Sequence, residues 1–121
     1  MTQTKSFSVS YDPERAKELG STEALIIEQR LFFLFERQPS SFVKFIAPCA
    51  HKDYIQGTSW TEELGMSAKR FRCAFDKIGR RYSSKTAFLN AEDPFKGRMY
   101  AYYKDRKEKK TIFIKNESQS E

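Results

Sequence analysis

Basic side chains gather in two short stretches of the sequence, and both could bind phosphate groups. In residues 69–80, lysines and arginines are interspersed with aromatic and small apolar residues. In residues 104–110, five basic residues stand against two acidic ones. Guanidinium and ammonium groups donate hydrogen bonds to phosphate oxygens and to the acceptor atoms of guanine. The chemistry to expect of these stretches is therefore contact with a polyanion.

The first basic stretch is expected to lie on the second helix of a helix-turn-helix. Ser59 and Glu62 form a capping box, which predicts a short helix at residues 60–64. Gly65 suits the left-handed position that ends a helix, and Ser67 is a fresh N-cap. The second helix is expected to span residues 68–78, or to extend to residue 82. Its apolar stripe, which should face the core, consists of Phe71, Ala74, Phe75 and Ile78.

The exposed face of this second helix is predicted to contact a nucleic-acid duplex, because the major groove is wide enough to admit an α-helix. Arg70, Arg72 and Lys77 are long enough to reach phosphates on either side. Lys69 and Arg80 could read guanine acceptors. The candidate contact residues on or beside the helix are Ser67, Lys69, Arg70, Arg72, Cys73, Asp76, Lys77 and Arg80.

Two of these residues are not basic. Asp76 could accept a hydrogen bond from a cytosine amine, and the small Cys73 would let the helix approach the groove closely. An alternative is an ordinary solvated face, since Arg72–Asp76 and Asp76–Arg80 are both i,i+4 ion pairs on a continuous helix.

The second basic stretch is predicted to be the tip of a β-hairpin. Residues 99–103 and 111–114 are strand-like in composition, and the charged tip lies between them. Such a loop could lie along a phosphate backbone, or it could serve only to keep the chain in solution. Residues 83–98, which precede the hairpin, are expected to form a loop. The candidate contact residues of the tip are Lys104, Arg106, Lys107, Lys109 and Lys110.

An apolar helix is expected upstream, over residues 22–37, with Ser21 as its N-cap and Pro39 beyond its end. It is apolar nearly all round, so it is either the central core helix or has one face covered by a second copy of the chain. That face would be formed by Leu25, Ile26, Phe32 and Phe33. Residues 1–20 are expected to be an arm with a short extended stretch, and the state of residues 38–58 stays open.

The overall composition limits the classes of function. The chain has 121 residues and a net charge of +6, which fits one domain, residues 21–115, followed by a tail at residues 116–121. Residues 1–61 are neutral, whereas residues 62–115 carry +8 and the tail −2. With two cysteines, one histidine (His51) and no glycine-rich phosphate loop, we expect no enzyme activity, metal, cofactor or small-molecule ligand. The apolar runs are too short for a signal peptide or membrane span, which favours a cytoplasmic protein.

The order of these motifs resembles the winged helix-turn-helix DNA-binding families, especially small domains of plasmid replication initiators, phage replication proteins and mobile-element regulators. The resemblance rests on residues 23–26 (EALI), 60–67 (WTEELGMS), 71–78 and 100–114. It implies an α+β fold, mainly helical, in which the second helix enters the major groove of double-stranded DNA and the hairpin acts as the wing. It also implies regulation of transcription or replication by occupancy in a bacterial cytoplasm. Because a domain this small reads only a short half-site, we expect a homodimer that reads a palindrome.

Two other functions remain open from the sequence. A winged-helix adaptor or inhibitor could use the basic face against an acidic protein. A single-strand or RNA-binding protein could stack bases on exposed tyrosines such as Tyr100, Tyr102 and Tyr103.

Overall fold

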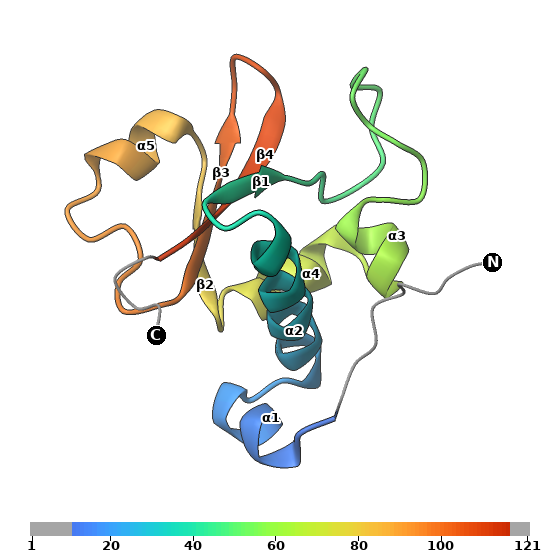
Figure 1. Ribbon diagram of the computed structural model, residues 1–121, viewed down its shortest axis with the longest axis vertical. Coiled ribbons are helices and arrows are strands. Elements are labelled where there is room, and N and C mark those ends of the chain that lie inside the picture. The colour runs from blue at the N-terminus through green and yellow to red at the C-terminus, as the bar shows by residue number, and fades with distance from the viewer. Residues whose placement is uncertain (1–10, 117–121) are drawn as a thin grey trace.

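Helices and strands are mixed along the chain, as expected of an α+β fold. The computed structural model describes residues 11–116, and within them it contains five helices and one four-stranded sheet (Figure 1). The predicted extended stretch near the N-terminus lies almost wholly outside the described residues. In chain order the elements are α1 (Pro13–Leu19), α2 (Thr22–Arg37), β1 (Ser41–Val43), α3 (Trp60–Leu64), α4 (Ala68–Phe75), β2 (Gly79–Tyr82), α5 (Lys85–Asn90), β3 (Tyr100–Asp105) and β4 (Lys110–Lys115).

The sheet has the strand order β1-β4-β3-β2. The predicted hairpin is present: β3 and β4 pair antiparallel, with Tyr102 opposite Phe113. On one side β1 pairs antiparallel with β4, which makes a strand of a segment whose state the sequence left open. On the other side β2 pairs in parallel with β3. The hairpin is therefore held on both flanks and does not project as an isolated ribbon.

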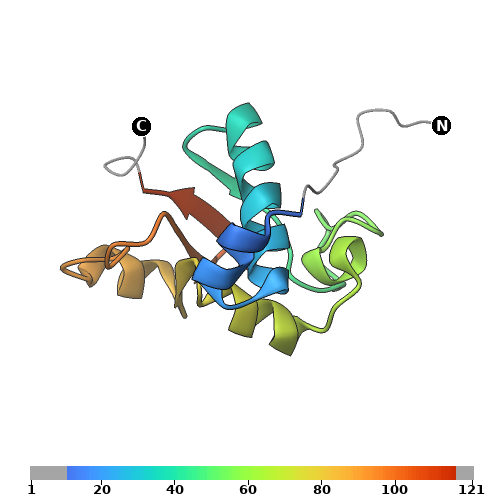
Figure 2. The same cartoon turned by 90° about the horizontal axis from the view of Figure 1, so that it is seen from below.

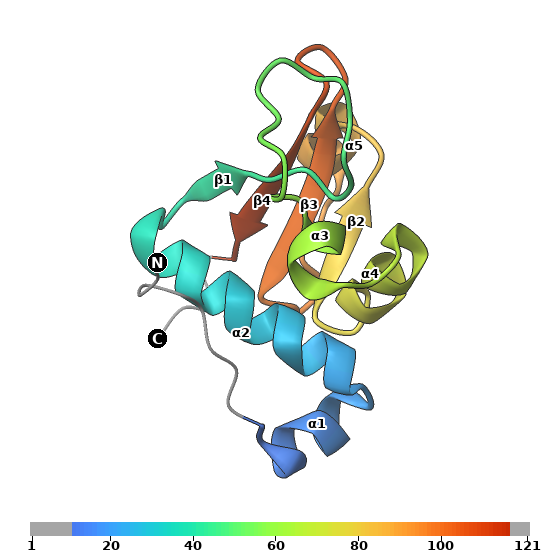
Figure 3. The ribbon, with the colours of Figure 1, turned by 90° about the vertical axis from the view of Figure 1, so that its right-hand side faces the viewer.

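The core lies between the sheet and three helices. Figure 3 shows α2, α3 and α4 on one side of the sheet and α5 behind it. The predicted stripe of α4 is buried, because Phe71, Ala74, Phe75 and Ile78 are each no more than 4% exposed. Phe113 of β4 is fully buried at the centre of this layer. Its ring lies within 6.5 Å, centroid to centroid, of the rings of Phe42, Trp60, Phe71, Phe75 and Tyr102.

The N-terminal helices correct one prediction and confirm another. Residues 13–19 were expected to be part of an arm, but they form α1, because Asp12 caps the helix and Pro13 is compatible with its first turn. The bounds of α2 agree with the prediction, including its cap: the Ser21 hydroxyl accepts from the amide of Ala24 (3.0 Å). Arg15 joins the two helices by donating to Glu28 (Nε to Oε1, 3.0 Å).

The second correction concerns the end of α4. It stops at Phe75, not at Ile78 or Tyr82, and the chain turns at once into β2. Gly79 permits this turn, because a Cβ there would lie 2.6 Å from the Phe75 ring and 2.7 Å from the Tyr100 carbonyl oxygen. Residues 80–82 are thus on a strand, and Arg80 is not part of the helix.

Residues 83–98 were expected to be a loop, but they contain α5. The Ser84 hydroxyl accepts from the Ala87 amide (3.1 Å) and starts the helix. Phe88 packs between Tyr82 and Tyr103, with both ring centroids at 5.5 Å. Figures 1 and 2 show α5 on the opposite side of the molecule from α3. The segment β2–α5 thus extends the sheet and covers its outer face.

The capping box of α3 is confirmed, and it predicts a pH effect. The Glu62 carboxylate accepts from the Ser59 amide (3.1 Å), the Ser59 hydroxyl (2.7 Å), the Gly57 amide (3.0 Å) and the Tyr54 hydroxyl. These bonds favour the ionised form and lower the pKa of Glu62 from 4.5 to about 2, with the bond from Tyr54 contributing most.

Because the pKa is lower in the folded protein, the ionised Glu62 stabilises the fold above pH 4.5, and this contribution is lost as the pH falls towards 2. We expect Glu62→Gln to flatten the pH dependence of the free energy of unfolding in that interval, as measured by urea denaturation. Glu36→Gln, at an exposed position of α2, is the matched control. An unchanged pH profile in Glu62→Gln would show that the carboxylate is not held as described.

Candidate nucleic-acid interface

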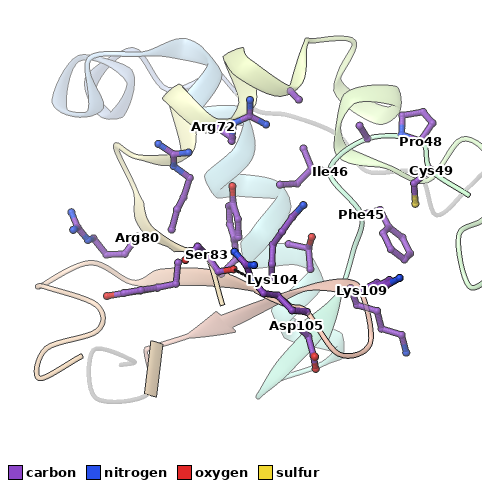
Figure 4. A pocket seen from close by; sticks show the side chains of 18 of the residues that line it. Phe45, Ile46, Pro48, Cys49, Arg72, Arg80, Ser83, Lys104, Asp105 and Lys109 are labelled. Carbon is purple, nitrogen blue, oxygen red and sulfur yellow. Dashed lines mark hydrogen bonds between the residues drawn. The ribbon is translucent and has the colours of Figure 1, made fainter. Parts of the chain in front are cut away.

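A groove of about 1310 Å³ runs between α4 and the β3–β4 hairpin. In Figure 4, Arg72 lies on one side and Lys104, Asp105 and Lys109 lie on the other, with Arg80 and Cys49 towards opposite ends. Seven basic and two acidic side chains line it: Arg72, Arg80, Arg81, Lys104, Arg106, Lys109, Lys110, Asp76 and Asp105. We call this surface the basic groove. It is where the two basic stretches of the sequence meet.

The tip of the hairpin has a defined turn. The Asp105 carboxylate accepts from the amides of Lys107 and Glu108, both at 3.1 Å, and its carbonyl oxygen accepts from the Lys109 amide at 2.6 Å. Lys109 has a φ of 59°, in the left-handed region. The acidic residue at the base of the tip therefore shapes the turn, while the lysine side chains are left for solvent or a ligand.

Some basic residues of the tip are already engaged within the protein. Lys110 forms an ion pair with Asp53 (3.1 Å), and Arg106 donates to the Ser83 carbonyl oxygen (Nε to O, 3.1 Å). The His51 ring, in the loop before α3, is hydrogen-bonded through Nε2 to the Glu108 carbonyl oxygen (2.8 Å). This loop thus braces the tip from the side. Within residues 11–116, no carboxylate forms an ion pair with the tip residues Lys104, Lys107 and Lys109.

The candidate residues of α4 divide between the groove and other surfaces. Arg72 and Asp76 line the groove. Arg70, expected to contact phosphate, instead forms an ion pair with Glu23 at the start of α2. Lys77 lies in the turn after α4, and its carbonyl oxygen accepts from Arg98. The remaining candidates, all exposed outside the groove lining, are Ser67, Lys69 and Cys73.

Asp76 has a different partner from the one expected. On a continuous helix it would pair with Arg72 or Arg80, but the Asp76 carboxylate accepts two hydrogen bonds from Arg81 (Nε to Oδ1, 2.7 Å; Nη2 to Oδ2, 2.9 Å). The carboxylate raises the pKa of the Arg81 guanidinium. Arg81 was not among the predicted contact residues. The sequence signal that could have distinguished Arg81 from Arg80 is the strand-like run at residues 79–82 (GRRY). Successive side chains of a strand point to opposite faces of a sheet, so the two arginines have different surroundings.

The three tyrosines of β3 belong to the core. Tyr100, Tyr102 and Tyr103 are only 5%, 4% and 7% exposed, so they do not offer the exposed rings that the alternative of single-strand or RNA binding requires. Burial raises the pKa of the Tyr102 hydroxyl to about 12, although the charges of Arg81 and Arg72 act in the opposite direction. The hydroxyl therefore stays protonated at neutral pH beside the basic groove.

The apolar face proposed for a second copy is largely used within the chain. Leu25 is 2% exposed, Ile26 and Phe33 are half-buried, and the Arg37 guanidinium lies 4.2 Å from the centroid of the Phe33 ring. Of the four residues expected to contact a second copy, Phe32 is therefore the one that is strongly exposed, at 59%.

Residues 11–116 hold no cluster of histidine, cysteine and carboxylate side chains that could bind a metal ion. Over the same residues, no helix is long and apolar enough to cross a membrane. Comparisons of the chain with protein-family models, with curated proteins and with solved structures found no match.

Proposed function

We propose that this chain binds double-stranded DNA as a winged helix-turn-helix protein. In this proposal α4 enters the major groove, and the β3–β4 hairpin acts as a wing on the phosphate backbone. The observation that carries the proposal is the basic groove, which is lined by seven basic side chains from α4, β2 and the β3–β4 hairpin and by two carboxylates. An arrangement of this kind attracts a polyanion and releases its counterions on binding.

The shape of the interface supports the same proposal. α4 is an α-helix of eight residues, and the diameter of an α-helix with its side chains, about 10–12 Å, matches the width of the major groove, about 12 Å. Lys69 and Cys73 are exposed on the helix and are therefore accessible to a ligand. Nine of the nineteen residues that line the groove are charged, whereas sites for drug-sized ligands have only a few polar groups.

By its resemblance to winged-helix proteins of plasmids, phages and mobile elements, we further propose that the chain regulates transcription or replication by occupying its site. This part of the proposal predicts preferred binding upstream of the genes it controls, or at a replication origin. Binding of the chain to fragments of its native genome, compared with fragments of equal length and base composition, tests it.

The binding step itself is tested by titrating the full chain against a random duplex and against a single strand of the same length at several salt concentrations. On the duplex, the logarithm of the association constant should fall by about 0.9 per logarithmic unit of salt for each phosphate contacted. Polyglutamate serves as a competitor that imitates an acidic protein. Absence of duplex binding at low salt contradicts the proposal, and stronger binding of polyglutamate than of the duplex would favour the adaptor or inhibitor function.

A further inference from the structure

The Asp76 carboxylate and the Arg81 guanidinium form an ion pair with no net charge in the basic groove. Asp76 follows the last residue of α4, and Arg81 is the third residue of β2. Their two parallel hydrogen bonds, of 2.7 and 2.9 Å, hold the guanidinium in the plane of the carboxylate. Both side chains are nevertheless open to solvent, at 46% and 40% exposed. The pair is therefore oriented by the protein and accessible to a ligand.

The position of the pair in the groove determines which donor groups of Arg81 a ligand can reach. Arg81 lies opposite Tyr102 in the β2–β3 register, and both residues line the groove together with Arg72. Two of the five guanidinium N–H groups of Arg81 donate to Asp76 and another contacts the Tyr102 hydroxyl, which leaves two N–H groups for other acceptors. A flexible arginine would lose side-chain entropy on contacting a base, but this arginine is already ordered.

The charge of the pair distinguishes it from the other basic residues. Attraction to phosphate depends on net positive charge, and the Asp76 carboxylate cancels that of Arg81 and repels an approaching phosphate. The unpaired lysines of the hairpin tip are better placed to bind the backbone. What the pair retains is directional hydrogen bonding, and an oriented arginine is the commonest reader of the guanine acceptors O6 and N7.

We propose that Arg81, positioned by Asp76, is a specificity-determining residue that reads a guanine base edge in duplex DNA. This inference rests on the proposed function and goes beyond it, because it assigns base recognition to Arg81 of β2 and to Asp76 at the end of α4. Asp76 is a positioning residue in this arrangement, since it acts on the base through Arg81.

The test is selection of bound sequences from a random duplex pool by the native chain and by two variants. Arg81→Lys keeps the charge but removes the planar fork of donors. Asp76→Asn removes the charge of the positioning group with little change in shape. We expect the native chain to select a guanine at one position of its site by roughly tenfold over other bases. Both variants should lose most of that preference while remaining folded, because exposed ion pairs contribute little to stability.

A merely electrostatic role predicts a different result. Asp76→Asn raises the charge of the groove, so it would then strengthen binding to all duplexes and leave the base preference unchanged. Lys104→Gln, in the same groove, is the matched control and should weaken binding evenly without changing the selected sequence.

The possible failures are distinguishable. If the native chain binds no duplex at low salt, the proposed function and this inference are both wrong. If it binds duplex without base preference, or if Arg81→Lys and Asp76→Asn keep the native preference, duplex binding stands and the role of Arg81 is wrong. Circular dichroism and urea denaturation of each variant establish that it is folded before selection.

Discussion

A variant carrying Lys104→Gln, Lys107→Gln and Lys109→Gln is expected to bind duplex DNA about 500-fold more weakly than the native chain at about 0.1 M salt. The three lysines extend from the hairpin and its tip, and within the described residues none of them pairs with a carboxylate. If each neutralises one phosphate, the slope of the logarithm of affinity against that of salt falls by about 2.7 units. Variant and native chain should then bind almost equally near 1 M salt. Fluorescence anisotropy over a salt series measures both quantities.

The control for this variant removes the same charge from other surfaces. Lys17 on α1, Lys85 on α5 and Lys96 before β3 are exposed and lie outside the lining of the basic groove. Glutamine at these three positions should leave the slope close to its native value. Equal losses in the two triple variants would mean that net charge alone drives binding, and the hairpin would then have no role as a wing.

Phe113→Ala is expected to lower the free energy of unfolding by about 3–5 kcal/mol. The side chain is fully buried, and five aromatic rings from β1, α3, α4 and β3 surround it. Its removal leaves a cavity that this rigid set of rings cannot close without moving. Since small domains have a total stability of about 5–15 kcal/mol, the variant should be partly unfolded at physiological temperature. Urea denaturation followed by tryptophan fluorescence measures the change, because Trp60 is one of the neighbours.

Val43→Ala provides the comparison within the same sheet. Val43 lies opposite Ile112 and is 45% exposed, so its loss should change the free energy of unfolding by no more than about 0.5 kcal/mol. A loss below about 1 kcal/mol in Phe113→Ala would mean that the surrounding rings collapse into the space, contrary to the packing described here.

The parts of the fold that the sequence predicts well are governed by local chemistry. Ser21, Ser59 and Ser67 each accept from an amide three residues further on, and Gly65 adopts the left-handed conformation, with a φ of 66°. These contacts join near neighbours, so residue type and spacing are sufficient to predict them. Asp12 uses the same chemistry, since its Oδ1 accepts from the Arg15 amide, but residues 1–20 were expected to be an arm, and α1 was therefore not predicted.

The end of α4 depends on a contact that sequence periodicity does not reveal. The helical spacing of apolar residues continues through Ile78, yet β2 begins at Gly79 because a strand from the far end of the chain, β3, is there to pair with it. This distant partner moves Arg80 and Arg81 from a helix to a strand. The two basic stretches that meet in the groove can be recognised in the sequence because charge is a property of residue type. The Asp76–Arg81 pair cannot, because its geometry depends on the sheet.

The pairing of β1 with β4 also has a consequence for synthesis of the chain. Val43 and Ile112 face each other in register. At about 5–20 residues per second, a ribosome needs roughly 3–14 seconds to proceed from one residue to the other. During that interval the buried face of α2 and the edge of β1 have no sheet to cover them, and Phe113 is not yet present to fill the centre of the core. A nascent chain that stalls before residue 110 therefore exposes both surfaces and becomes a substrate for chaperones and proteases.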